Sequence, residues 1–201
     1  AYHIWTGGDE GVYMSRSIDS GESWEQNSLR ISPIEVISTT FPQVDAGDPG
    51  RIAITYLGSE NSSELGEPDI DGENWTGNAH YATTNVSYHL YITLSLNALD
   101  PVPTFYTFRV TDDPVQIGSI CLNSGDCRDI GGSNRNLLDF NDLHIDREGR
   151  VFVAFADGCT DSCASDSNST AEDSRSRRGS MYYLGSGPSL YESVGLMESP
   201  F

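Results

Sequence analysis

Apolar and polar residues alternate in short runs along the whole chain, and Gly, Pro, Asn and Asp separate these runs. Alternation with a period of two predicts strands, and no run shows the 3.6-residue period of an amphipathic helix. The predicted strands are 3–6, 12–16, 27–31, 43–46, 51–57, 89–95, 105–110, one that ends at 145, then 151–156, 181–184 and the weaker 189–194. The predicted fold class is therefore all-β.

A short motif marks the turn after the second strand. Residues 17–24, SIDSGESW, have the form S-x-D-x-G-x-x-W, with Ser17, Asp19, Gly21 and Trp24 at the fixed positions. Asp19 can accept backbone N–H bonds across the turn, and Gly21 can take a positive φ. The indole of Trp24 is expected to be mostly buried between adjacent sheets. Residues 95–105 are a degenerate copy, with Asn in place of Asp and Phe in place of Trp.

The motif resembles the Asp-box of sialidase-like β-propellers, and residues 8 to about 184 are similar to exo-α-sialidase-like proteins with BNR repeats. Further residues that carry the resemblance are 135–140, Asp146, Gly149 and 156–159. It implies blades of four-stranded antiparallel sheets. The chain 1–201 is then a single partial propeller domain with blade 1 at about 1–34, which lacks its inner strand, blade 2 at about 40–112 and blade 3 at about 135–201.

Three blades form only part of a ring, because closed propellers have about four to eight blades. We therefore expect these residues to be the C-terminal blades of a larger propeller. An upstream segment or a second chain would complete it, since an open blade edge leaves backbone groups unpaired. The strand near His3 is expected to lie beside a strand from outside these residues.

The chain of 201 residues has a formal net charge of −19, and all 11 of its basic residues are Arg. Such a surface repels phosphate backbones, which excludes nucleic acid as a partner. Either a salt-rich setting or a bias in nucleotide composition accounts for the charge. No stretch reaches the roughly 20 apolar residues of a membrane span. The first five residues predict a strand rather than a signal peptide.

The four cysteines form two close pairs, Cys121 with Cys127 and Cys159 with Cys163. Two local disulfides are the simplest connectivity, and a zinc site of four thiolates is the alternative. Disulfides are typical of an oxidising compartment. Four N-glycosylation sequons agree with an extracellular or cell-surface location. These sequons begin at Asn61, Asn74, Asn85 and Asn168.

Two long polar stretches, 58–87 and 157–179, each join the second strand of a blade to the third. In a propeller these loops open on the face where ligands bind, and solvated surface loops that carry glycans are the alternative. The residues expected on the ligand face are Arg135, Asn136, Asp139 and Asp157.

True sialidases use an arginine triad, a Tyr nucleophile assisted by Glu, and an Asp acid. The resemblance implies that the first arginine and the Asp acid belong to early blades, which this chain lacks. Arg135 could then be a later triad arginine, and Tyr182 or Tyr183 could be the nucleophile, although a strand Tyr is more often part of a core.

Asp69 and Asp71 lie in a run of oxygen-bearing side chains that could bind calcium, and solvated loop acids are the alternative. No other cofactor is expected. The function expected first is an extracellular sialidase-like module that binds a glycan or a surface protein. The alternatives are a glycoside hydrolase of the exo-sialidase type and a structural subunit of an extracellular surface assembly.

Overall fold

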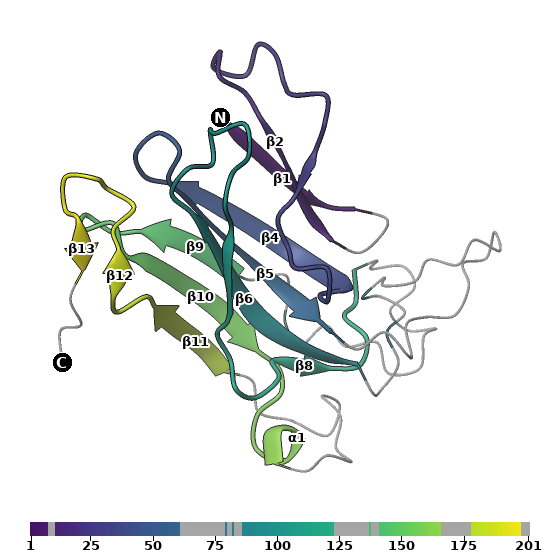
Figure 1. The fold of residues 1–201 in the computed structure, drawn as a ribbon. Helices are drawn as coiled ribbons and strands as arrows, with labels where there is room; N and C mark the ends of the chain where they lie inside the picture. The colour runs from purple at the N-terminus through teal and green to yellow at the C-terminus, as the bar shows by residue number, and fades with distance from the viewer. Residues whose placement is uncertain are drawn as a thin grey trace.

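The structure, a computed structural model, describes residues 1–7, 11–60, 79, 82, 86–122, 137, 141–165 and 178–197. Nearly all of its regular structure is β (Figure 1). The elements are β1 (Tyr2–Thr6), β2 (Val12–Arg16), β3 (Leu29–Arg30), β4 (Ser38–Ala46), β5 (Ile52–Ser59), β6 (Ser87–Ser95), β7 (Tyr106–Arg109), β8 (Gln116–Ile117), β9 (Asn141–Ile145), β10 (Val151–Asp157), α1 (Ser162–Ser165), β11 (Arg178–Tyr183), β12 (Gly187–Pro188) and β13 (Leu196–Met197).

The strands form three antiparallel sheets in the order of the chain. Sheet I has the order β1-β2-β3, sheet II the order β4-β5-β6-β7 with β8 paired to β6, and sheet III the order β11-β10-β9. The strands β12 and β13 form a separate small ribbon. No sheet in the described part of the chain closes on itself. The predicted all-β class is confirmed, whereas the strand predicted at 189–194 is wrong, because turns join β12 to β13 there.

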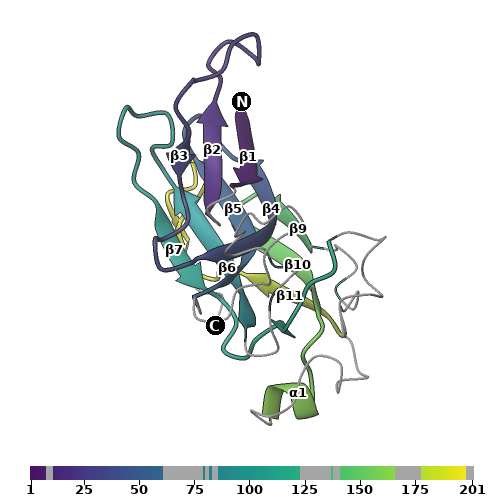
Figure 2. The same cartoon turned by 90° about the vertical axis from the view of Figure 1, so that its right-hand side faces the viewer.

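The three sheets are stacked with sheet II in the middle. β1 contacts β4, and β4 contacts β9, so these three strands run side by side through the stack (Figures 1 and 2). All eight residues of β5 are buried. Because side chains alternate along a strand, Ile52, Ile54 and Tyr56 pack toward sheet I, and Ala53 and Leu57 pack toward sheet III.

Each gap between sheets is filled by its own apolar core. Val12 and Met14 of β2 lie in the core between sheets I and II. Leu90, Ile92 and Leu94 of β6 lie in the core between sheets II and III, which also contains Val151, Val153 and Phe155 of β10. Full burial of one such side chain stabilises a fold by about 1.5–3 kcal/mol. Two such cores therefore hold the stack together.

The same tight turn precedes β5 and β10. In the first turn, the N–H of Gly47 donates to the carbonyl of Arg51 at 3.0 Å, and Gly50 has φ of 85°. In the second, the N–H of Asp146 donates to the carbonyl of Arg150 at 2.9 Å, and Gly149 has φ of 77°. This φ favours glycine. The two turns start their strands at equivalent positions.

The turn at residues 17–24 has the predicted internal hydrogen bonds. The backbone N–H of Ser23 donates to Asp19 Oδ1 at 2.9 Å, and the hydroxyl of Ser17 donates to the same oxygen at 2.8 Å. The N–H of Gly21, whose φ is 91°, donates to Ser17 Oγ at 2.7 Å. The hydrogen bonds from Ser23 and Ser17 lower the pKa of Asp19 to about 2. The prediction that Asp19 binds the amides of its own turn is confirmed.

The prediction that Trp24 is mostly buried is wrong, because 39% of this residue is exposed. Its indole meets the ring of His3 edge-on, with centroids 6.0 Å apart, on the face of sheet I that points away from sheet II. Within the described residues no sheet covers that face. The tryptophan therefore lies on an outer surface instead of between two sheets.

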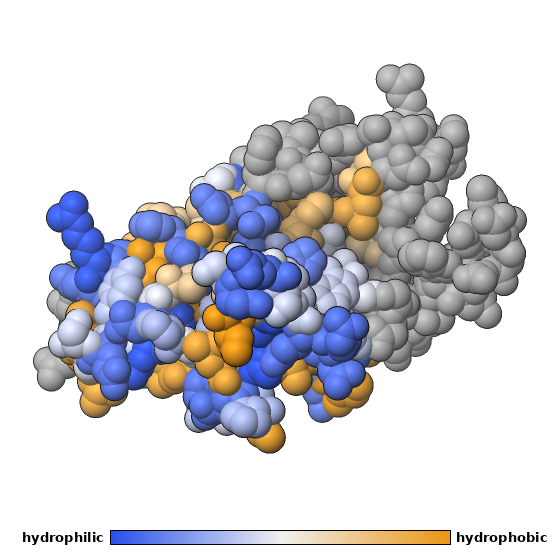
Figure 3. All heavy atoms as spheres, turned by 90° about the horizontal axis from the view of Figure 1, so that it is seen from above, coloured by the Kyte–Doolittle hydropathy of each residue, from blue (hydrophilic) through white to orange (hydrophobic). Residues whose placement is uncertain are grey.

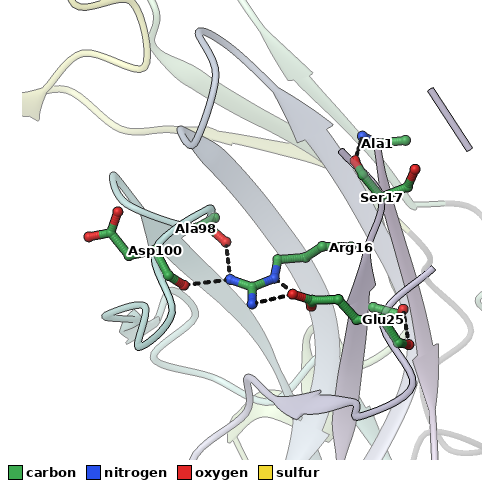
Figure 4. A network of polar contacts seen from close by, with 7 residues as sticks. Ala1, Arg16, Ser17, Glu25, Ala98 and Asp100 are labelled. Atoms are coloured by element: carbon green, nitrogen blue, oxygen red, sulfur yellow. Dashed lines mark hydrogen bonds and ion pairs between the residues drawn. The ribbon is translucent and has the colours of Figure 1, made fainter. Parts of the chain in front are cut away.

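Arg16 ties sheet I to sheet II (Figure 4). Its guanidinium is buried and donates two hydrogen bonds of 2.6 Å to the carboxylate of Glu25. It also donates to the carbonyls of Ala98, at 2.8 Å, and Asp100, at 2.7 Å, in the connection between β6 and β7. The hydrogen bond with Glu25 raises the pKa of Arg16 and lowers that of Glu25. Next to it, Ala1 and Ser17 exchange two backbone hydrogen bonds.

Replacing Arg16 with Met should destabilise the protein by about 2–4 kcal/mol, because the buried carbonyl of Ala98 and the part-buried carbonyl of Asp100 lose their donor and Glu25 loses its counter-charge. Chemical denaturation at neutral pH measures this loss. Arg147→Met, in the exposed turn before β10, is the control and should change stability by less than about 0.5 kcal/mol. Equal effects of the two substitutions would contradict the role given to Arg16.

Asp19→Ala should lower the midpoint of thermal unfolding at pH 7, because the turn loses its acceptor. The folded pKa of about 2 lies below the ordinary value of 3.8. The stabilising effect is therefore present above the ordinary value and is lost as the pH falls toward about 2. Thermal scans of wild type and variant should converge over that range. A difference that does not depend on pH would contradict this, and Asp112→Ala, at an exposed loop position, is the control.

Candidate functional site

The ends of several strands meet at one end of sheets II and III, the end that carries α1 (Figure 1). β5 ends there at Ser59, β6 begins there at Ser87, and β7 ends there at Arg109. In sheet III, β10 ends there at Asp157, which pairs with Arg178 at the start of β11. Ionisable side chains of both sheets therefore gather at this end.

A pocket of about 390 Å³ opens at this end of sheet II. His89 and Tyr91 are two residues apart on β6, so their side chains leave the same face of the sheet. Arg109 lies opposite Tyr91 on β7, and Glu60 follows the last residue of β5. The lining residues are Ser59, Glu60, Ser87, His89, Tyr91 and Arg109.

Contacts with neighbouring residues hold both the ring of Tyr91 and the proton of its hydroxyl group. Its ring stacks on that of Tyr56, with centroids 5.5 Å apart and planes 3° from parallel. Its hydroxyl donates to Glu60 Oε1 at 2.7 Å. Burial and then the contact with Glu60 raise the pKa of Tyr91 above its ordinary value. The phenol therefore remains protonated at neutral pH and acts as a hydrogen-bond donor.

His89 is a neutral imidazole in this pocket. Its Nδ1 lies 3.1 Å from the carbonyl oxygen of Thr111, and a carbonyl oxygen can only accept, so Nδ1 carries the hydrogen. Burial lowers the pKa of His89, the hydrogen bond to Thr111 opposes this, and the positive charge of Arg109 lowers it further. The pocket thus combines a carboxylate, a guanidinium, a protonated phenol and a neutral imidazole.

Asp157, which the sequence predicts on the ligand face, lies at the same end of the molecule in sheet III. Burial raises its pKa, and a 3.1 Å hydrogen bond from the N–H of Cys159 opposes the rise. The Cys159–Cys163 disulfide, with Cα atoms 5.0 Å apart, closes the turn that follows. A half-buried carboxyl with a raised pKa is a candidate functional group. Its role in ligand binding remains a prediction.

The predicted Cys159–Cys163 disulfide is confirmed, and Cys121 is also disulfide-bonded. A zinc site made of all four thiolates is therefore wrong, because oxidised cysteines carry no thiolate to bind the metal. Cys127, the predicted partner of Cys121, lies outside the described residues.

Tyr182 and Tyr183 are neighbours on β11 and therefore point to opposite faces of sheet III. Tyr182 stacks on Phe155 at 5.7 Å between ring centroids, and Tyr183 stacks on Phe152 at 5.6 Å. Neither tyrosine is among the residues that line the pocket. The two residues are 41% and 42% exposed, and a role for either as a nucleophile remains a prediction.

Several predicted site residues lie outside the described residues, so their predictions stand as made. These are Asp69 and Asp71, expected to bind calcium, Arg135, Asn136 and Asp139, expected on the ligand face, and the sequon residues Asn61, Asn74, Asn85 and Asn168. Within the described residues no group of three or more His, Cys, Asp or Glu side chains could hold a metal ion. Nor does the described part contain a helix long and apolar enough to cross a membrane.

The pocket residues Glu60, His89, Tyr91 and Arg109 were not predicted from the sequence. The available signal was weak: His89 and Tyr91 follow a long polar stretch at strand spacing, and Glu60 stands at the start of that stretch. Arg109 carries no such signal. The pairing of β6 with β7 places Arg109 next to Tyr91.

No protein-family model matches the chain, and neither a curated protein nor a solved structure is significantly similar to it.

Arg109→Gln should raise the pKa of His89, because the substitution removes a positive charge that disfavours the imidazolium. An NMR titration of the imidazole resonances measures this shift. Arg147→Gln, in the turn at the opposite end of sheet III, should leave the pKa of His89 unchanged. A fall in the pKa of His89 in the Arg109 variant would show that the two side chains do not interact as described.

Proposed function

We propose that the three sheets are successive blades of a sialidase-like β-propeller, and that the chain is an extracellular module that binds a glycan. Two features support the architecture. Strands that follow one another in the chain pair as antiparallel neighbours, and β1, β4 and β9 run through the stack side by side. The bound Asp19 in its turn supports the interpretation of residues 17–24 as an Asp-box. The Cys159–Cys163 disulfide supports an oxidising compartment.

The observation that carries the binding function is the pocket of Glu60, His89, Tyr91 and Arg109. Sugar hydroxyls both donate and accept hydrogen bonds, so they suit a site that offers both kinds of group. The carboxylate of Glu60 accepts, and the phenolic oxygen of Tyr91, whose proton goes to Glu60, can also accept. The guanidinium of Arg109 donates and can bind a ligand carboxylate. The pocket therefore favours a glycan that bears an acidic sugar.

A glycoside hydrolase of the exo-sialidase type is the second candidate, and one observation favours it. The 2.7 Å hydrogen bond between Tyr91 and Glu60 is the contact that a tyrosine nucleophile and an assisting glutamate would make. The raised pKa of Tyr91 favours binding over catalysis, because the phenol is held in its protonated and less nucleophilic form. Tyr91 replaces Tyr182 and Tyr183 as the tyrosine to test.

Calorimetric titration with sialylated and neutral oligosaccharides tests the proposal. The wild-type chain should prefer the sialylated ligand, and Arg109→Gln should weaken that binding by roughly tenfold or more, because a charge-assisted contact is lost. Tyr91→Phe keeps the ring stacked on Tyr56, removes the hydroxyl that holds Glu60 in place and should also weaken binding. Arg147→Gln is the control and should bind as the wild type does.

Two outcomes would change the proposal. Binding that is the same for wild type and Arg109→Gln would place the glycan elsewhere. If the wild type releases sialic acid from a chromogenic sialoside and Tyr91→Phe does not, the function is that of a hydrolase and not that of a binding module.

A further inference from the structure

Sheets II and III repeat one pattern of strand pairing. Both begin with the tight turn before β5 and β10, so Arg51 and Arg150 are equivalent, and the residues that follow them align one to one. The cross-strand pairs then correspond. The pair Ala53–Leu94 of sheet II matches Phe152–Tyr183 of sheet III, and Thr55–Ile92 matches Ala154–Met181.

We call the face of sheet III that points away from sheet II its outer face. This face is equivalent to a face that is buried in sheet II. Ile92 and Leu94 pack against sheet III and are each 4% exposed. Their counterparts Met181 and Tyr183 are 66% and 42% exposed. The face has the residue types of a packing surface, yet no sheet in the described part of the chain covers it.

Sheet I can be aligned in the same way through the turns that begin at Ser17 and Ser95. The pairs His3–Ser15 and Trp5–Tyr13 of sheet I then match Ile54–Thr93 and Tyr56–Tyr91 of sheet II. Even the ring stacking is repeated: Trp5 stacks on Tyr13 at 6.2 Å, as Tyr56 stacks on Tyr91 at 5.5 Å.

The outer face of sheet I is therefore equivalent to the face of sheet II that packs on sheet I. In sheet II, Ile54, Tyr56, Tyr91 and Thr93 are all buried there. In sheet I, His3 is exposed and Trp5 and Tyr13 are half-buried. On the side of the molecule where sheet I lies, hydrophobic groups interrupt the hydrophilic surface (Figure 3).

The two outer faces are thus the two halves of an interface that the chain already forms twice. We infer that the outer face of sheet III docks on the outer face of sheet I of a second copy of this chain, head to tail. A contact of this kind closes into a ring when its rotation allows and otherwise extends as a filament. The inference rests on the repeated strand pairing and is independent of the glycan pocket.

The shapes of the two faces fit this arrangement. Ala154, Ala156 and Gly179 line a depression of about 540 Å³ on sheet III. Sheet I offers the bulky rings of Trp5 and Trp24 to fill it. A Cβ at Gly179 would meet no atom within 4 Å, so the depression is open. Each face has one acidic residue at its edge, Asp142 on sheet III and Glu25 on sheet I, where Glu25 is paired with Arg16.

Sedimentation of the 201-residue chain from about 1 μM to about 1 mM tests the inference. We expect association that is stronger in about 1 M salt than in about 0.05 M, because salt screens the repulsion between copies of net charge −19. Met181→Glu on sheet III and His3→Glu on sheet I should each weaken it by roughly tenfold or more. Both residues are exposed, so circular dichroism should show a folded chain.

The control Val102→Glu adds the same charge at an exposed position between β6 and β7 and should leave association unchanged. An equimolar mixture of the Met181→Glu and His3→Glu chains should form a heterodimer, because one intact contact remains between them. If the wild type is monomeric at every protein and salt concentration, the inference is overturned. A different protein segment would then cover the two faces.

A dimer that only one of the two substitutions disrupts would also overturn the inference, because it would pair like faces instead of unlike ones. Glycan titration of the Met181→Glu variant tests the pocket separately, since all the pocket residues lie within or beside sheet II.

Discussion

The burial of β5 on both faces is the constraint on which the rest of this structure depends. A strand whose eight residues are all buried needs a sheet on each side, and sheets I and III provide them. It also has no surface position left for a polar functional group. Chemistry can therefore occur only beyond the ends of the strand, and Glu60, the residue that follows β5, is part of the pocket.

Arg16 gives the contact between sheets I and II a second, polar component. Apolar packing alone tolerates small rotations of one sheet against another. A guanidinium held by a carboxylate and by two carbonyls across the gap fixes their relative position. Glu25 follows the turn at residues 17–24, so the turn that holds Asp19 also positions the counter-charge for Arg16. Local turn geometry and the packing of two sheets are linked in this way.

The strands could be predicted from the sequence because alternation is a local signal. The predicted strand 51–57 begins one residue before β5, which starts at Ile52. The register between strands could not be predicted from the sequence, because it depends on pairing between residues that are far apart in the chain. The pocket was missed for this reason: Glu60, Tyr91 and Arg109 come from three segments that meet only after β5, β6 and β7 have paired. Trp24 was placed wrongly because a motif specifies a turn and says nothing of what covers it.

The pairing of neighbouring strands has a kinetic consequence. Five-residue connections join β4 to β5 and β9 to β10, so closing these hairpins costs little chain entropy and should be fast. β6 can join β5 only after a much longer connection has closed. Hairpins β4–β5 and β9–β10 are thus the natural first structures on the folding route, and the pocket, which needs β6 and β7, is assembled late. Proteolysis or a chaperone acting on a partly folded chain would therefore meet preformed hairpins before it met a binding site.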